Sequence, residues 1–457
     1  MRVFFKRWDA LIVMVIILTM YFLSVNAVYY TSYTMGAIEL ARNIPSGRFD
    51  VNPQLCNYAD YIVRDSKCFF VAPLGLALVL IPSVKLAEIL KGSDLVFAGF
   101  TMAFFGVLTF YIALKLYDTL FEDRRKSLIL ALTSGLAGPL YIYSTHIFPQ
   151  APLAFFYTLF VLSALKICLG GGFEWAFIAG FSASMAVLLD PSTFISIVTL
   201  CLITLAKLVL TSKALEEGLQ RVLINITLFI VSFLPMLSLL LYYNVVVTGS
   251  IFVFPEQLYL ERIGVRGFDI AYTPQGLFTL LVDIRKGLLP LYPIYMLSLA
   301  YLPKMLKKLG KYEKTIYLAS MITPTLVYAS WYDADGGLSY GPRFLVTITP
   351  LLIAPLALGL ENRAVSRILA ILSLYSFAEN LIVVISTPYP SSFEDLKPFE
   401  IQLITAIGKL LEGDRSAYIY KILSATVGEP IATIVSIAII TTIAATALIV
   451  TKEADRQ

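Results

Sequence analysis

The sequence predicts an all-α polytopic membrane protein with about twelve transmembrane helices and a first outer loop that contains a juxtamembrane helix. Hydrophobic residues make up 58% of the 457 residues, which is more than a soluble globular chain of this length keeps in solution. Only 14% of the residues are charged, and most of them fall between long apolar stretches. Stretches of about 20 apolar residues match the thickness of the hydrocarbon core of a bilayer.

The apolar stretches define a single integral membrane domain over residues 1–457. The first stretch follows the basic start "MRVFFKRWD". We expect it to be a retained signal anchor, because it is longer than the apolar core of a cleaved signal peptide. The candidate spans are 9–30, 94–117, 127–145, 150–168, 174–190, 192–210, 222–247, 286–303, 315–331, 343–360, 367–387 and 430–451.

Basic connections between the spans predict the orientation. "EDRRKS", "TSKALEEGLQR", "KMLKKLGKYEK" and "ENRAVSR" lie on one side of this topology, and short basic loops stay in the cytoplasm. Both termini are then cytoplasmic, provided that the apolar run 72–90 does not cross the membrane. Its two prolines, lysine and glutamate favour an interfacial helix. We therefore expect residues 31–93 to form the first extracytoplasmic loop and residues 388–429 the last.

The composition argues against several classes of function. The 35 Lys and Arg residues barely exceed the 31 Asp and Glu residues and fall in separated clusters, so no nucleic-acid partner is expected. A single histidine, four cysteines and no CxxC pair leave little room for a zinc or haem site. A divalent cation such as Mg²⁺ or Mn²⁺ would have to be held by carboxylates. No metal ligand is assigned.

Charged side chains are concentrated in the predicted first outer loop. Glu39, Asp50 and Asp60 stand there among several arginines and Lys67. One of these acids is a candidate base that accepts a proton from an acceptor hydroxyl at the membrane surface. The alternative is a solvated loop whose charges pair weakly, at about 0–1 kcal/mol per pair.

Two of the four cysteines, Cys56 and Cys68, lie in the same predicted outer loop. Disulfides persist on the extracytoplasmic side, so a bond between them is one hypothesis. It would close a short loop and stabilise the fold by up to about 3 kcal/mol. Two free thiols are the other hypothesis.

Polar residues also stand at the outer ends of predicted spans. His146 and Gln150 are one helical turn apart in "YSTHIFPQAPLAFF", and Asp190 precedes a proline in "LLDPST". All three are candidates for a substrate pocket, because ionisable groups near membrane depth are often functional. An interfacial hydrogen bond for the histidine and a helix cap for the aspartate are the simpler explanations.

Two later segments carry cations where an apolar stretch begins. Arg285 and Lys286 in "DIRKGLLPLYP" either extend to lipid headgroups or hold the phosphate of a lipid substrate. The second segment is "WYDADGGLSYGPRF", whose glycines permit a tight bend and whose Arg343 stands at the membrane re-entry. An arginine there can hold phosphate oxygens in a bidentate manner. The polar residues grouped with it as pocket candidates are Asp333, Asp335 and Tyr340.

The order of these segments resembles the C-type glycosyltransferase superfamily. "CFFVAPLGLALVLIPSVKL", "YYNVVVTGSIFVF", "DIRKGLLPLYPIYML" and "GGLSYGPRFLVTITPLL" follow one another along residues 1–360. They are most similar to segments of prokaryotic relatives of dolichyl-phosphate-mannose protein mannosyltransferases. Family members usually carry an acid just after the first span, where this chain reads "YYTSYTMG".

The resemblance implies an inverting sugar transfer on the extracytoplasmic face. The donor would be a polyprenyl-phosphate sugar in the membrane lipid, and the acceptor a glycan, a lipid or a protein. Arg343 matches the arginine of the GPR motif, and Arg285 or Lys286 matches the RG position. Asp60 and Lys67 match polar positions before the proline-glycine segment. Without the early acid, Asp50 and then Glu39 are the expected bases.

Two alternatives to an active transferase stay open at this point. A transporter or flippase for a lipid-linked substrate would place ionisable residues deep inside several spans, whereas here they stand mostly at span ends. The missing early acid is also compatible with a relative that has lost activity.

Overall fold

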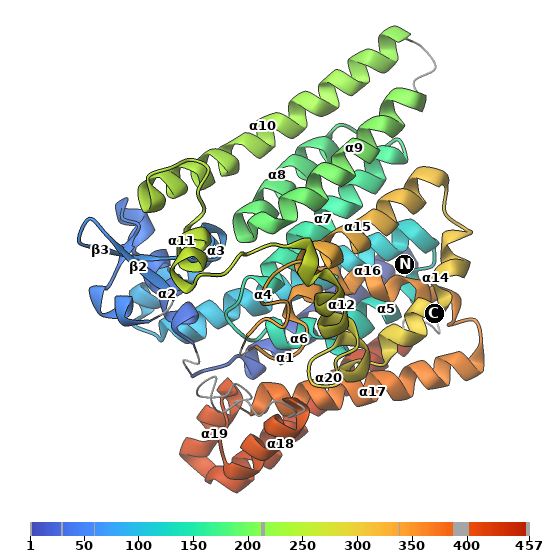
Figure 1. Cartoon of the computed structure of the whole chain (residues 1–457). Coiled ribbons are helices and arrows are strands. Elements are labelled where there is room, and N and C mark those ends of the chain that lie inside the picture. The colour runs from blue at the N-terminus through green and yellow to red at the C-terminus, as the bar shows by residue number, and fades with distance from the viewer. Residues whose placement is uncertain are drawn as a thin grey trace.

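Long helices lying side by side make up most of the molecule (Figure 1). Within the described residues, six helices are long and apolar enough to cross a membrane, and four shorter apolar helices accompany them. The structure is a computed structural model that describes residues 2–28, 31–58, 60–211, 215–337, 339–386 and 402–453. Residues 388–401 of the predicted loop 388–429 therefore lie outside the described residues, and its part from 402 onward is described.

The helices follow one another along the whole chain. Those of membrane length are α4 (Asp94–Phe121), α7 (Gln150–Cys168), α9 (Phe194–Thr211), α10 (Leu215–Thr248), α17 (Arg363–Ile385) and α20 (Glu429–Glu453). The other helices of ten or more residues are α1 (Arg2–Ser24), α2 (Ser32–Asn43), α3 (Leu74–Leu90), α5 (Arg124–Leu136), α8 (Glu174–Leu189), α14 (Ile294–Leu306), α15 (Lys311–Ala329), α18 (Gln402–Glu412) and α19 (Tyr418–Val427). The short ones are α6 (Leu140–Tyr143), α11 (Pro255–Ile263), α12 (Thr273–Leu281), α13 (Leu288–Leu291) and α16 (Thr349–Ile353).

Every predicted span overlaps a helix, but three of them are broken into short pieces. Each break lies beside a proline, namely Pro139, Pro293 or Pro350. Proline interrupts a helix because it removes a backbone donor and clashes with the preceding turn. The interrupted spans are 127–145, 286–303 and 343–360.

Buried tyrosines satisfy backbone carbonyls near these breaks. The Tyr117 hydroxyl of α4 donates to the carbonyl of Pro350 at 2.5 Å, and the Tyr21 hydroxyl of α1 donates to the carbonyl of Gly135 at 2.6 Å. Lipid offers no such donor, so an interrupted helix at membrane depth needs one from the protein. The tyrosines thus make the broken spans compatible with a membrane interior.

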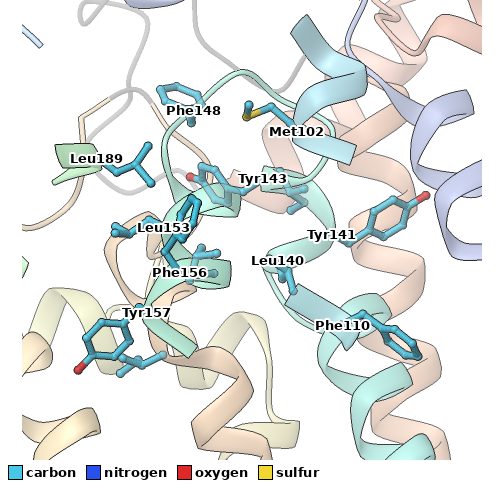
Figure 2. Close-up of a cluster of buried hydrophobic side chains, with 14 of the residues drawn as sticks. Met102, Phe110, Leu140, Tyr141, Tyr143, Phe148, Leu153, Phe156, Tyr157 and Leu189 are labelled. Carbon is cyan, nitrogen blue, oxygen red and sulfur yellow. The ribbon is translucent and has the colours of Figure 1, made fainter. Parts of the chain in front are cut away.

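The core continues from these tyrosines to the turn between α6 and α7. Figure 2 shows Met102 of α4, Tyr143 of α6 and Phe156 of α7 among the packed side chains of this region. Phe148, in the turn, has its ring 5.8 Å from that of Tyr143. Core packing therefore holds the start of α7 in place.

A small antiparallel sheet in the first loop departs from the all-α prediction. It consists of β1 (Asp50–Val51), β2 (Tyr61–Arg64) and β3 (Lys67–Phe70), with β3 in the middle. The predicted helix within 72–90 is present as α3, which packs on α2, α4 and α8. Together with α2 and α11, these elements form one end of the molecule, which we call the sheet end (Figure 1).

The structure joins Cys56 and Cys68 in a disulfide, as one of the two hypotheses expected. Replacing both by alanine should lower the free energy of unfolding by about 3 kcal/mol, because the unfolded chain regains the freedom of a loop of 12 residues. Chemical unfolding in detergent measures this change. The matched control replaces Cys168 and Cys201, which are not bonded to each other or to other cysteines. A similar loss in both double variants, or no effect of a reductant on the wild type, would count against the bond.

Basic connections gather at the opposite end of the molecule. Lys126, at the start of α5, donates to Glu361 before α17 at 3.0 Å. The Arg221 guanidinium of α10 donates to the carbonyl of Gly171, between α7 and α8, at 3.2 Å. Helix α7 begins near the sheet end and finishes beside Gly171, so these connections are separated from the sheet end by the length of a span (Figure 1).

Candidate active site

A cavity of about 810 Å³ opens at the sheet end. Its walls are mostly apolar side chains from α10, from the corner between α8 and α9, and from the turn before α7. Among the described residues, three ionisable side chains other than tyrosine line it: Asp190, Glu256 and Arg343. Pockets of this size with a few convergent polar groups are typical ligand sites. The segments that supply these three side chains lie far apart in the sequence.

Arg343 comes from the 3₁₀ turn Arg343–Ile348 that follows the glycine-rich bend. Its guanidinium carbon lies 4.7 Å from the ring centre of Phe344 and 5.9 Å from that of Phe148. The Nε atom is buried and has no hydrogen-bond partner among the described residues. Gly336, with a φ of +76°, passes so close that a Cβ there would be 2.9 Å from this Nε. Glycine at that position is therefore what leaves room for the arginine.

Asp190 ends α8 and caps the 3₁₀ turn that starts α9. Its Oδ1 accepts hydrogen bonds from the Ser192 amide at 3.0 Å and the Ser192 hydroxyl at 2.6 Å. Its Oδ2 accepts one from the Tyr328 hydroxyl of α15 at 2.8 Å. These three hydrogen bonds fix the direction of the carboxylate. Asp190 thus has the predicted capping contact and also faces the cavity.

Glu256 lies in the first turn of α11 and was not singled out in the sequence. Its Oε1 atom is buried and has no hydrogen-bond partner among the described residues. Loss of solvent around the carboxyl, and to a smaller extent the charge of Asp190, raise its pKa to about 8. The cavity therefore contains one carboxylate that is fully bonded and one that is not.

The three acids expected as bases lie away from the cavity wall. Glu39 is bonded to Arg42 at 2.5 Å. Asp50 belongs to β1 and pairs with Phe69, while Asp60 accepts a hydrogen bond from the Ser32 hydroxyl. In the stretch "YYTSYTMG", where family members usually carry the early acid, Tyr33 lines the cavity.

Apart from Arg343, the cations expected to bind phosphate do not line the cavity. Lys67 is exposed on β3. Arg285 forms an ion pair with Asp283 at 2.5 Å. Lys286 is buried, and its Nζ donates to the carbonyl of Asp335 at 3.0 Å and to that of Gly337. Lys286 therefore contacts the glycine-rich bend and does not line the cavity.

The two aspartates of the bend share a backbone donor. The Gly337 amide donates to Asp335 Oδ1 at 2.8 Å and to Asp333 Oδ1 at 3.2 Å. Burial, followed by the carboxyl of Asp335, raises the pKa of Asp333. The pair therefore holds a proton more readily than two separate carboxyls would. Neither side chain lines the cavity.

Distant helices hold the rest of this bend. The Tyr340 hydroxyl donates to Glu379 of α17 at 2.9 Å. Gln402 of α18 donates to the Ser339 carbonyl at 2.9 Å and accepts from the Gly341 amide at 2.6 Å. Glu379 is an acid inside an apolar span, which is a signal of function that the sequence already contained. Gln402 offered no such signal.

Of the pair His146 and Gln150, only Gln150 lines the cavity. Gln150 begins α7 and lines the cavity. His146 is buried in the preceding turn, with Nδ1 2.9 Å from the Ile142 carbonyl and 3.0 Å from the Thr145 hydroxyl, and it is not on the cavity wall. The contacts of the histidine match the simpler explanation of an ordinary hydrogen-bonded side chain.

The acids of the cavity do not form a metal site by themselves. Among the described residues, no group of three or more His, Cys, Asp or Glu side chains is placed to hold a metal ion. Asp190 is already bonded to Ser192 and Tyr328.

Comparisons with known proteins were made for sequence and for structure. No protein-family profile matches the sequence, and no curated protein matches it either. The structure is similar to ArnT from Cupriavidus metallidurans bound to undecaprenyl phosphate. The TM-score is 0.56, with 13% identity over 98% of this chain and 78% of that one.

A second similarity is to the archaeal oligosaccharyltransferase AglB from Archaeoglobus fulgidus, solved with an inhibitory peptide and a dolichol-phosphate. The TM-score is 0.52, with 13% identity over 92% of this chain and 57% of that one. A further structure of the Archaeoglobus enzyme, with Zn and sulfate, has a TM-score of 0.52 and 17% identity. The chain spans little more than half the length of that enzyme. The resemblance expected from the sequence is confirmed for the fold: the chain shares the fold of ArnT and AglB.

Proposed function

We propose that the protein transfers a sugar, with inversion, from a polyprenyl-phosphate donor to an acceptor on the extracytoplasmic face of the membrane. The observation that carries this proposal is the cavity, where Arg343 meets the carboxyl groups of Asp190 and Glu256 within mostly apolar walls. Apolar walls suit a prenyl chain, and the arginine suits its phosphate. The acceptor is a glycan, a lipid or a protein.

The orientation belongs to the same proposal. Basic connections lie at the end away from the cavity, as Lys126 beside Glu361 illustrates. The positive-inside rule then places that end in the cytoplasm and the sheet end outside. In this topology all twelve predicted spans cross, including the interrupted ones, and α3 lies at the outer interface. Nucleotide sugars are absent there, which favours a donor carried by lipid.

The fold supports the choice of donor class. ArnT was solved with undecaprenyl phosphate and AglB with a dolichol-phosphate, and this chain shares their fold. In the transfer, the bond between the anomeric carbon and the phosphate oxygen breaks, and the electron pair goes to the phosphate. A fixed guanidinium at that oxygen stabilises the developing charge.

The test uses the purified full-length protein in liposomes with a panel of labelled polyprenyl-phosphate hexoses and pentoses. Envelope glycans, lipids and peptides are supplied as acceptors. We expect one donor to lose its label to an acceptor, while the same sugar on a polyprenol without phosphate is not used. Failure of every donor, together with no measurable binding of undecaprenyl phosphate, would reject the proposal.

A further inference from the structure

An unpartnered carboxyl oxygen in the cavity suggests how the acceptor is activated. Glu256 lines the cavity from α11, and its Oε1 is buried without a hydrogen-bond partner among the described residues. A buried polar atom without a partner is rare in folded proteins and calls for an explanation, such as a ligand. We infer that Glu256 is the catalytic base that takes the proton from the acceptor hydroxyl, an inference that rests on the proposed function.

The acids of the first loop are less suited to this role. Glu39 is held by Arg42, and that arginine also bonds to Asp94 of α4. Asp50 is part of the sheet, and Asp60 is engaged by the Ser32 hydroxyl. A general base must come within hydrogen-bond reach of the proton that it abstracts. A rearrangement of the first loop would be needed to bring any of these three onto the cavity wall.

Asp190 faces the same cavity but is bonded differently. Three donors, two from Ser192 and one from Tyr328, occupy its oxygens. Asp190 is therefore better suited to orient a substrate hydroxyl, and the free oxygen of Glu256 to accept a proton. Two carboxyl groups with different environments commonly divide such roles.

The position of α11 favours the return of Glu256 to its ionised form. The residue lies in the first turn of the helix, where backbone N–H groups point outward and favour negative charge. Its own amide already contributes in this direction. Neighbouring Gln257 accepts a hydrogen bond from the Phe254 amide at 2.7 Å, which fixes the start of the helix. The carboxyl is thus held on a rigid element.

The acceptor oxygen forms a bond with the anomeric carbon of the donor sugar, and its proton moves to Glu256 Oε1. The bond from that carbon to the phosphate oxygen breaks on the opposite face, and the electron pair remains on polyprenyl phosphate beside Arg343. The configuration of the anomeric carbon is inverted. The glutamic acid then releases its proton to solvent before the next turnover.

This role predicts a specific pH dependence. A base must be ionised to act, so kcat/KM should rise with pH until about 8, the pKa of Glu256, and then level off. Below this value, kcat/KM should fall about tenfold for each pH unit. In the part of the chain that the structure describes, the other titratable or charged groups near the carboxyl include Asp190, Tyr33, Tyr243 and Arg343. This rise of kcat/KM with pH is assigned to Glu256 if it is absent from the Glu256→Gln variant.

The deciding experiment compares Glu256→Gln with the matched control Glu261→Gln, an exposed acid on the same helix. Glutamine preserves the shape of the side chain but accepts no proton. We expect Glu256→Gln to lower kcat by about 10²-fold or more, with unchanged binding of undecaprenyl phosphate, and Glu261→Gln to match the wild type. Glu256→Asp should retain a measurable fraction of the activity. Thermal unfolding confirms that each variant is folded.

The outcomes separate this inference from the proposed function. If the wild type transfers sugar and Glu256→Gln does so within threefold, or keeps the same rise of kcat/KM with pH, Glu256 is not the base but the transferase stands. If the wild type neither binds undecaprenyl phosphate nor uses any donor, the proposed function fails and this inference fails with it. Loss of lipid binding in Glu256→Gln would likewise overturn the assignment as a base.

Discussion

Replacing Arg343 by alanine is expected to lower sugar transfer by about 10²- to 10³-fold. The guanidinium lies on the cavity wall, and its buried Nε has no protein partner among the described residues, so a donor is available for a phosphate oxygen. The charge that develops on the leaving phosphate loses its stabilisation without it. The measurement is kcat with the donor identified in liposomes, together with the affinity for undecaprenyl phosphate, which should also fall.

Two further variants test the chemistry behind this effect. Arg343→Lys keeps the positive charge but loses the planar, bidentate geometry, so activity should lie between those of alanine and wild type. Arg266→Ala removes a highly exposed arginine between α11 and α12 and should leave transfer unchanged. Equal loss in Arg266→Ala and Arg343→Ala would show a general electrostatic effect, contrary to a specific phosphate site.

The cavity was partly predictable because some of its residues stand at recognisable ends of apolar stretches. Asp190 precedes a proline, Gln150 begins an apolar run, and Arg343 follows a glycine-proline pair. Span ends on one side of a membrane lie at a similar depth, so such residues are brought to one level. The structure places all three on one cavity wall.

Glu256 was not predictable by the same reasoning. The segment between α10 and α13 contains several acids, and sequence alone does not distinguish the one that turns inward. Its burial depends on how α11 folds back toward α10 and the first loop. The converse holds for the ion pair of Glu39, because its spacing of three residues from Arg42 on one helix already indicated that pair. Local pairing was readable from the sequence, while a contact between distant loops was not.

The limits of the fold prediction have a similar cause. Apolar length alone locates α7 and α8 to within a residue, because both are continuous apolar helices. The break at Pro350 is stable since Tyr117, more than 200 positions away, donates to its carbonyl. The small sheet consists of strands of two to four residues, which are too short to be recognised by periodicity.

Replacing Lys286 by methionine is expected to lower the free energy of unfolding by about 3 kcal/mol, because removing one partner of a buried polar group leaves the others unsatisfied. The ammonium donates to the carbonyls of Asp335 and Gly337 and lies 3.9 Å from the Asp335 carboxylate. It thereby supports the bend from which Arg343 projects. Transfer should fall by about tenfold as that arginine loses its fixed position.

Unfolding of the lipid-free protein distinguishes this supporting role from direct binding of the lipid phosphate. A lysine that served only the phosphate would be an unpaired buried cation without lipid, and methionine in its place would leave stability unchanged or increase it. A lysine that supports the bend lowers stability when lost, whether lipid is present or not. Lys307→Met, at an exposed position, is the control and should have no effect. If the lipid-free Lys286→Met variant is as stable as the wild type but binds lipid more weakly, Lys286 binds the lipid phosphate and does not support the bend.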